Sequence, residues 1–362
     1  MSILEPMSPG SNRRGRFEVA VQPSFLHDVL IVLWSALGGD DGGANRELGR
    51  RWFDGIRRAV PSDLADQMYA FGGDSGTVWL SLIDWIASAP DPSDPHDTIE
   101  WLSSSDGPDR RKTALTDLCW DVDPSDLEMA LAGDPDAIEA CLARFEPEER
   151  EAVERWLTFP AESFASEVAS VLARIISEVL PTEAKAWPDA HKRSAAAVEP
   201  LIGMMEPTDL IEQVTNGITF DIPLGVRRLV LIPSVSLKPW SLTIESGDTV
   251  YIHYPLADEH LDPDPAAPPQ WLINFHKALG DERRLRMLRR IADGPVRLSE
   301  LTETVGLAKS TVFHHIGILR SAGLIRVHVG SHGDGGPTYT LRREALGTAA
   351  EFTSQYLTGD RS

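Results

Sequence analysis

Two adjacent histidines, His314 and His315, stand inside the stretch KSTVFHHIGILRSAGLI at residues 309–325. An imidazole can bind a metal, donate a hydrogen bond to a nucleic-acid base, or fill a buried position in a core. The pattern around the pair decides among these three roles. Apolar residues separated by four and three positions predict a helix with a single core-facing side. These core residues are Val312, Ile316 and Leu319.

The same spacing predicts different surroundings for the two histidines. His315 follows Val312 by three residues and precedes Ile316, so we expect it to lean toward the core. His314 follows Ser310 by one helical turn and should face outward. Because Ala308 stands where a capping side chain is usual, the first backbone N–H groups of this helix are predicted to be open to a phosphate.

The outward side of the helix carries the side chains that nucleic-acid recognition requires. We expect Lys309 to contact phosphate, and Ser310, Thr311 and His314 to face base edges. Arg320 and Arg326 are expected to add contacts to the DNA backbone. The candidate DNA-binding residues are Lys309, Ser310, Thr311, Phe313, His314, Arg320, Arg326, His328 and His332.

The segments around this helix follow an order that positions it. WLINFHKAL is a short amphipathic helix, and DERRLRMLRRIADG is a second one with Leu285, Leu288 and Ile291 predicted to point inward. LSELTETVG is a third helix with Ser299 as its expected N-cap. After the fourth helix at 309–322, LIRVHV and TYTLRR read as strands around the tip GSHGDGGP, and a last helix, REALGTAAEFTSQYL, follows. This order is typical of a winged helix-turn-helix domain.

Charge is divided unevenly between the two parts of the chain. The net charge of the 362 residues is −21, which by itself argues against a nucleic-acid partner. Residues 271–362, however, hold 13 Lys and Arg against 9 Asp and Glu, a net of +4, whereas residues 1–270 carry a net of −25. Only the C-terminal part is therefore expected to approach phosphates.

The stretch LGDERRLRMLRRIADGPVRLSELTETVGLAKSTVFHHIGILRSAGLIRV closely resembles the DNA-binding domain of ArsR-type (arsenic-repressor-like) bacterial transcriptional regulators, and the similarity runs from about 271 to 345. The resemblance implies a homodimer in which the first and last helices of the domain pack across the two-fold axis. It also implies one recognition helix for each half-site of double-stranded DNA. We expect a repressor, although the sequence does not distinguish repression from activation.

Metal sensing is not expected at the positions that many ArsR-type proteins use. The third helix of the domain, ELTETVG, has no cysteine, and the last helix offers only Glu344 and Glu351. Soft metal sites need thiolate or imidazole clusters, which these positions do not supply. His328 and His332 in the predicted wing stand four residues apart with no third ligand nearby, so contact with DNA or an idle solvent position is expected. We therefore expect no metal and no cofactor.

The first part of the chain predicts an α+β domain. RFEVAVQ at 16–22 alternates like a strand, a buried helix is predicted to begin near Ser24, and residues 113–205 are mostly helical, with Pro181 ending one helix. ITFDI, RRLVLIP and TVYIHYP are predicted to form a small antiparallel sheet. RFEVAVQPSFLHDVL and RLVLIPSVSLKPW…VYIHYP also resemble a region of poorly defined function that is often fused ahead of such DNA-binding domains in bacterial regulators.

The predicted organisation follows composition along the chain. We expect a disordered start at 1–15, a regulatory, sensor or scaffolding domain at 16–260, a Pro- and Asp-rich linker at 261–270 and the DNA-binding and dimerisation domain at 271–362. No long apolar segment predicts a signal peptide or a membrane span, so we expect a cytoplasmic protein without a membrane partner. The two cysteines, Cys119 and Cys141, are expected to be small buried hydrophobes.

The sequence as a whole predicts a DNA-binding transcriptional regulator, with a small-molecule effector or a partner sensed by the first domain. Catalytic motifs such as a phosphate-binding loop, a serine elbow or HExxH do not occur, so we do not expect an enzyme. Aromatic residues could still line an apolar ligand pocket: Trp187, Trp240, Tyr251 and Tyr254. The alternatives are an enzyme or a protein-interaction module that carries the winged helix as an accessory.

Overall fold

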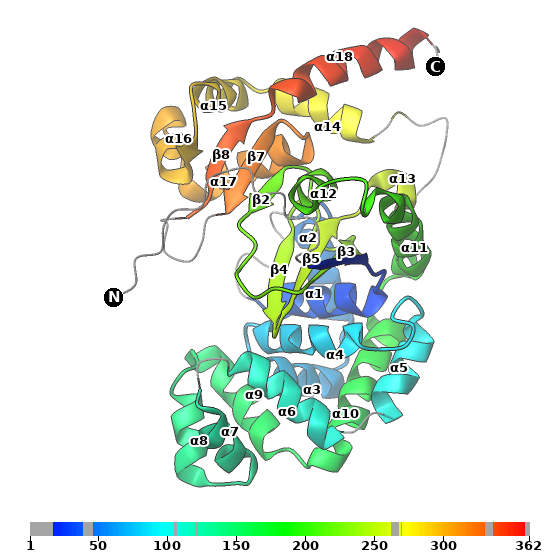
Figure 1. Cartoon of the computed structure of the whole chain (residues 1–362), viewed down its shortest axis with the longest axis vertical. Helices are drawn as coiled ribbons and strands as arrows, with labels where there is room; N and C mark the ends of the chain where they lie inside the picture. The colour runs from blue at the N-terminus through cyan, green and yellow to red at the C-terminus, as the bar shows by residue number, and fades with distance from the viewer. Residues whose placement is uncertain are drawn as a thin grey trace.

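The computed structural model describes residues 17–38, 46–104, 107–119, 122–261, 268, 270–329 and 336–358. We call residues 17–261 the body; a C-terminal helical domain lies against one end of it (Figure 1). The α+β class predicted from the sequence is confirmed, since many helices accompany two small sheets of four strands each. The predicted start at 1–15 and the tip of the wing at 330–335 lie outside the described residues.

The sheet of the body is mixed rather than antiparallel, which corrects the expectation. Its strands are β1 (Glu18–Val21), β3 (Arg228–Ser234), β5 (Thr249–Pro255) and β4 (Leu242–Ser246), in that spatial order. β1, β3 and β5 run parallel, and only β4 pairs antiparallel with β5. β3 and β5 are almost continuously buried, the pattern of parallel strands that are covered on both faces.

The two faces of β3 pack into different hydrophobic clusters. Val230 and Ile232 join the main cluster around α1 (Phe25–Leu37), which begins at the predicted position after Ser24. Leu229 and Leu231 point the other way, into a smaller cluster with residues of α11 (Trp187–Val198) and α12 (Pro207–Val214). The sheet is thus held between helices on both sides.

The helices that build the end of the body farthest from the C-terminal domain are α3 (Ser62–Gly72), α4 (Ile83–Ala87), α5 (Pro95–Ser104), α6 (Gly107–Leu118), α7 (Pro124–Leu131), α8 (Pro135–Leu142), α9 (Pro147–Thr158) and α10 (Ala161–Arg174) (Figure 1). α2 (Gly49–Ala59) and the short α13 (Asp258–Leu261) lie nearer to the C-terminal domain (Figure 1). Local sequence fixes several starts. Asp134 accepts hydrogen bonds at 3.0 Å from the N–H groups of Asp136 and Ala137, and Pro135 takes the first helical position of α8. Cys119 and Cys141 are buried, as predicted.

The C-terminal domain contains the expected helices and hairpin. They are α14 (Gln270–Leu279), α15 (Glu282–Ala292), α16 (Leu298–Val305), α17 (Lys309–Ser321), β7 (Ile325–Val329), β8 (Thr338–Leu341) and α18 (Arg343–Thr358). Two local expectations are wrong. Leu285 is 47% exposed because it lies on the outer side of α15, and the N-cap of α16 is Arg297, whose N–H is bound by the Glu300 side chain at 2.9 Å.

The second sheet joins the body to the C-terminal domain. Its order is β2-β7-β8-β6, with β6 at Val296–Arg297 and β2 at Ile218–Phe220. β2 was expected in the sheet of the body, but it pairs parallel with β7 of the wing, with Ile218 opposite Val327. The body therefore supplies the edge strand of the winged domain, although about a hundred residues separate the two strands in sequence.

Candidate nucleic-acid interface

Helix α17 presents three distinct faces to its surroundings. Val312, Ile316 and Leu319 are fully buried in the core of the C-terminal domain, as their spacing predicts. The exposed face carries the predicted DNA-reading side chains: Lys309, Ser310 and His314 are exposed, and Thr311 is half-buried. The structure thus brings these four residues together on the outer side of the first half of one helix.

The N-terminus of α17 adds backbone donors to this face. Its N-cap is Ala308, which supplies no side-chain acceptor, and the first intrahelical bond runs from the Val312 N–H to the Ala308 carbonyl at 3.0 Å. The N–H groups of the first turn point out of the helix end, where the helix dipole favours an anion. Together with Lys309, this end can bind a DNA phosphate.

The two adjacent histidines have separate surroundings, as predicted. His315 is buried, and its Nδ1 lies 3.5 Å from Nη1 of Arg284. Burial lowers the pKa of His315, with the Asp281 carboxylate opposing this shift and the Arg284 guanidinium adding to it. His314 is exposed, and the two ring centroids are 6.3 Å apart. One histidine therefore belongs to the core and the other to the outer surface.

The third face of α17 contacts the body, and it includes a residue that the sequence assigned to DNA. The phenyl ring of Phe313 stacks on the indole of Trp240, with centroids 4.6 Å apart and an angle of 9° between the ring planes. One turn later, Gly317 allows the indole to approach: a Cβ at this position would lie 3.1 Å from Cζ2 of Trp240. Phe313 is half-buried, and one face of its ring is occupied by the body through Trp240.

Arg320 extends the same face and also differs from its expected role. It is only 2% exposed, and its Nη2 donates to the Thr215 carbonyl at 3.0 Å and to Oγ of Ser241 at 2.9 Å. Its guanidinium carbon lies 5.4 Å from the centroid of the Trp240 ring, and burial lowers its pKa to about 9. In this arrangement Arg320 binds the body and has no access to a phosphate, because its side chain is enclosed.

The wing residues are divided between internal contacts and solvent. Arg326 donates to Glu212 of α12 and to Glu344 of α18, so both neighbours of its guanidinium are carboxylates rather than phosphate. His328 is exposed, and its Nδ1 lies 3.1 Å from Oγ1 of Thr219 on β2. His332 lies outside the described residues. On the described part of the wing, His328 is exposed and the Arg326 side chain is 32% exposed.

A buried polar network inside the body escaped prediction from the sequence. The Asp28 carboxylate, 1% exposed, accepts hydrogen bonds from Nε2 of His191 at 2.8 Å and from the Val235 N–H at 2.7 Å. It also accepts bonds from the hydroxyls of Ser234 and Ser236. Burial alone would raise the pKa of Asp28, but the bond to His191 and those to the serines outweigh it and lower the pKa.

This network fixes the loop that carries Trp240. Ser234 ends β3, and the chain then runs through residues 235–239 to the indole that meets α17. The sequence features that form this network are the His27-Asp28 pair at the start of α1 and the SVS triplet at the end of β3. They were uninformative on their own, because about two hundred residues separate the partners in sequence.

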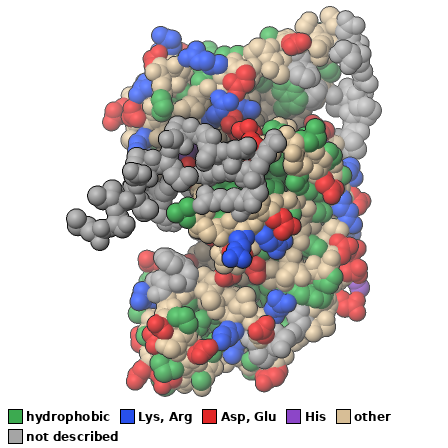
Figure 2. Space-filling model, in the orientation of Figure 1, with side chains coloured by type: hydrophobic (Ala, Val, Ile, Leu, Met, Phe, Trp, Pro, Cys, Tyr) green, Lys and Arg blue, Asp and Glu red, His purple; other side chains and the backbone are tan. Residues whose placement is uncertain are grey.

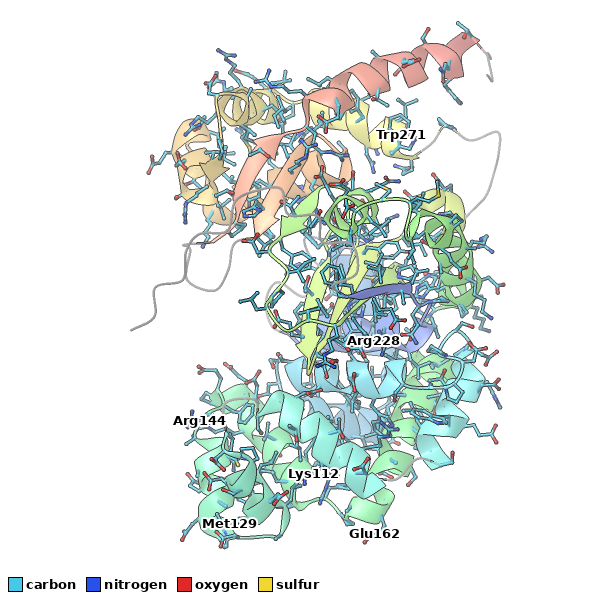
Figure 3. All side chains as sticks on the ribbon, viewed as in Figure 1. Lys112, Met129, Arg144, Glu162, Arg228 and Trp271 are labelled. Carbon is cyan, nitrogen blue, oxygen red and sulfur yellow. The ribbon has the colours of Figure 1, made fainter. Side chains whose placement is uncertain are left out.

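A cleft of about 240 Å³ opens where the body meets α14 and the end of α17. Its walls include Asn216, Lys238 and Asp258 from the body, Trp271 on α14 and Ser321 on α17. Figure 3 shows Trp271 on α14, in the part of the C-terminal domain nearest the body. Lys238 forms ion pairs with Asp258 and, at 3.5 Å, with Glu47, whose pKa is raised by burial. The aromatic residues proposed from the sequence do not line this cleft: Trp187, Tyr251 and Tyr254 are core residues.

Charge and composition of the described surface agree with this division of roles. Acidic side chains gather over the lower end of the body in Figure 2, whereas basic ones are prominent on the top of the C-terminal domain. Among the described residues, no group of three or more His, Cys, Asp or Glu side chains is placed to hold a metal ion. Across the described helices, none combines the length and apolar character that a membrane crossing requires.

Comparison with known proteins identifies the C-terminal domain. Residues 281–327, from the N-cap of α15 through most of β7, match the model of the bacterial regulatory protein, arsR family. Neither the curated proteins nor the solved structures gave a match to this chain. The matched segment contains α15, α16 and α17, the helices that place the exposed face described above. Residues 281–327 therefore form an ArsR-family helix-turn-helix domain, and this domain indicates DNA-binding transcriptional regulation.

Proposed function

We propose that the protein is a sequence-specific transcriptional repressor that binds double-stranded DNA as a homodimer through α17. The observation that carries the proposal is the exposed face of this helix inside an ArsR-family domain. Lys309 and the open helix end supply the contact to phosphate, while Ser310, Thr311 and His314 supply donors and acceptors for base edges. Contacts to bases give sequence specificity, whereas contacts to phosphate give affinity that depends on salt.

The proposal of a dimer rests on the last described helix. α18 projects beyond the other helices of the C-terminal domain (Figure 1), and it exposes apolar side chains along its length. Leu346 is 41% exposed, Tyr356 47% and Leu357 76%. His276 of α14 lies 3.0 Å from Thr353, which holds the first and last helices of the domain together. A second copy that packs against this pair would bury these side chains and set two recognition helices in one complex.

The body is proposed to sense an effector rather than to catalyse a reaction. Its most polar cluster, around Asp28 and His191, is fully buried and holds a loop in place. The cleft beside α14 contacts both the body and α17, so a small molecule bound there would touch both parts at once. If the body is instead an enzyme, residues 1–261 should turn over a substrate in an assay with a broad set of hydrolase and transferase substrates.

The deciding experiment is a comparison of base-reading and phosphate-contacting variants. A binding site is first selected from random duplexes with the wild-type protein, and its affinity is then measured at several salt concentrations. Thr311→Ala or His314→Ala should cost about 1–3 kcal/mol at one base position. Lys309→Ala should weaken binding to all sequences and reduce the slope of log K against log salt by about 1. Wild-type affinity in the triple variant Lys309→Ala, Thr311→Ala, His314→Ala would overturn the assignment.

A further inference from the structure

Residues outside the ArsR-family segment complete the DNA-reading domain. We call their contacts with it the seam; the body contributes Glu212, Thr215, Asn216, β2, Trp240 and Ser241 to it. None of these residues lies within 281–327. The seam unites strand pairing, buried hydrogen bonds, an ion pair and ring stacking, so it is a packed interface rather than a tether.

Trp240 is a seam residue that contacts α17 along its length. Its indole touches three positions on successive turns of the helix: it stacks on Phe313, lies against Gly317 and packs beneath the guanidinium of Arg320. Contacts at spacings of four and three residues follow one face of a helix. An indole held against that face opposes both rotation and sliding of α17.

The orientation of α17 decides which side chains reach DNA. The face on Trp240 adjoins the exposed face, since Phe313 lies three residues after the exposed Ser310 and four after the exposed Lys309. Rotation of the helix would move Thr311 and His314 relative to base edges, whereas phosphate contacts tolerate such movement better because charge acts without strict direction. The docked arrangement also leaves Lys309, Ser310 and His314 exposed, so it is compatible with a bound duplex.

The loop that carries Trp240 is anchored by residues of the body that do not belong to α17. The loop begins at Ser234, where Asp28 binds both serine hydroxyls and two backbone N–H groups. At its other end, the Ser241 hydroxyl oxygen accepts a hydrogen bond from Nη2 of Arg320 at 2.9 Å, and Nδ2 of Asn216 donates to the Arg320 carbonyl at 2.9 Å. The indole is therefore fixed by the core of the body before it meets α17.

We propose that Trp240 is a positioning residue for DNA recognition: the body, through the indole stacked on Phe313, sets the orientation in which α17 reads its sequence. This inference rests on the proposed reading role of α17. It assigns part of the sequence specificity to a segment that lies far from the family's own helices in the chain. The isolated winged domain would contain every reading residue but would lack the residue that orients them.

The test uses the full chain and two duplexes, the selected site and an unrelated sequence of the same length. Trp240→Ala should lower the ratio of specific to non-specific affinity by about tenfold, because a loosened α17 must be ordered on binding. Affinity for the unrelated duplex and the salt slope should stay close to wild type. Trp240→Phe, which keeps a flat ring against Phe313, should restore most of the ratio. A purely structural role of Trp240 would instead reduce both affinities in proportion to the loss of folded protein.

Two further variants keep the result decisive. Trp101→Ala removes a half-buried indole from α5, far from the seam, and should leave the ratio unchanged. Gly317→Ala retains Trp240 and favours helix, yet it places a Cβ 3.1 Å from the indole, so it tests the contact even if Trp240→Ala does not fold. A wild-type ratio in both Trp240→Ala and Gly317→Ala overturns the inference, as does tighter specific binding. If the triple variant of the reading face also binds normally, the proposed function fails as well.

Discussion

The indole of Trp240 lies parallel to the phenyl ring of Phe313, with 4.6 Å between the ring centroids and 9° between the ring planes. The first residue belongs to the acidic body and the second to α17 of an ArsR-family domain. Ring stacking of this kind contributes about 0.5–1.5 kcal/mol beyond the area that it buries. The pair therefore connects the two parts of the protein at the helix that is proposed to read DNA.

Arg320 offers a direct contrast between the role suggested by the sequence and the role seen in the structure. Arg320→Ala should lower the free energy of unfolding by about 2–4 kcal/mol, because it leaves the Thr215 carbonyl and Ser241 without their donor and opens a cavity. The salt slope of DNA binding by the folded variant should remain that of wild type, since Arg320 contacts no phosphate in this arrangement. Urea unfolding and binding at several salt concentrations measure the two effects. A slope reduced by about 1 would instead support the phosphate contact predicted from the sequence.

The dimer proposed for α18 can be tested with matched leucines. Leu346→Glu combined with Leu357→Glu should raise the dimer dissociation constant by at least about tenfold, because each leucine buried at an interface contributes on the order of 1.5–3 kcal/mol. Leu224→Glu, at a leucine of the body that is 82% exposed, is the control and should leave the dimer intact. Sedimentation velocity over a range of protein concentrations gives the measurement. Wild-type protein that stays monomeric throughout would refute the dimer itself.

Acid should destabilise the protein through two buried histidines of the body. Nε2 of His27 donates to the Ile83 carbonyl at 3.0 Å, so its Nδ1 is the acceptor for Nε2 of His253 at 3.1 Å. Burial lowers the pKa of both, that of His253 to about 4, with the neighbouring His191 adding to this effect and the Asp28 carboxylate opposing it. In the unfolded chain the pKa of both histidines is about 6.5.

The sign of the effect follows from proton uptake. Between about pH 6.5 and 4 the unfolded chain binds protons that the folded protein cannot, so stability falls as the pH is lowered through this window and is regained above it. For His253 the loss amounts to roughly 3 kcal/mol. Urea unfolding at stepwise pH should show a flatter dependence in His253→Gln than in wild type. His96→Gln, at an exposed histidine of α5, should keep the wild-type slope.

Local patterns were enough to predict the helices and the faces of the C-terminal domain. The spacing of Val312, Ile316 and Leu319 predicted the buried side of α17, and it also separated His315 from His314. This works because a helix repeats every 3.6 residues, so burial is encoded within one or two turns. The prediction for Leu285 was wrong because three-residue spacing alone did not show which side of α15 the neighbouring helices cover.

Contacts between distant segments could not be predicted in this way. Nothing in the sequence around Val327 indicates that its strand pairs with the distant Ile218. The apolar sequences of β3 and β5 likewise fit a parallel or an antiparallel sheet equally well. An arginine on a recognition helix also looks like a phosphate ligand until its enclosure by Thr215 and Ser241 is seen. Register and burial across domains depend on which surfaces meet, and a local pattern carries no information about that.

The sequence by itself thus determined the ArsR-type domain, the exposed side of α17 and the acidic character of the body, since each of these depends on residue types and their short-range spacing. Only the tertiary structure decided that β2 completes the wing sheet, that Asp28 anchors the loop bearing Trp240 and that Phe313 and Arg320 face the body. The physical reason is that these contacts are chosen by the packing of surfaces that the chain brings together only when it folds.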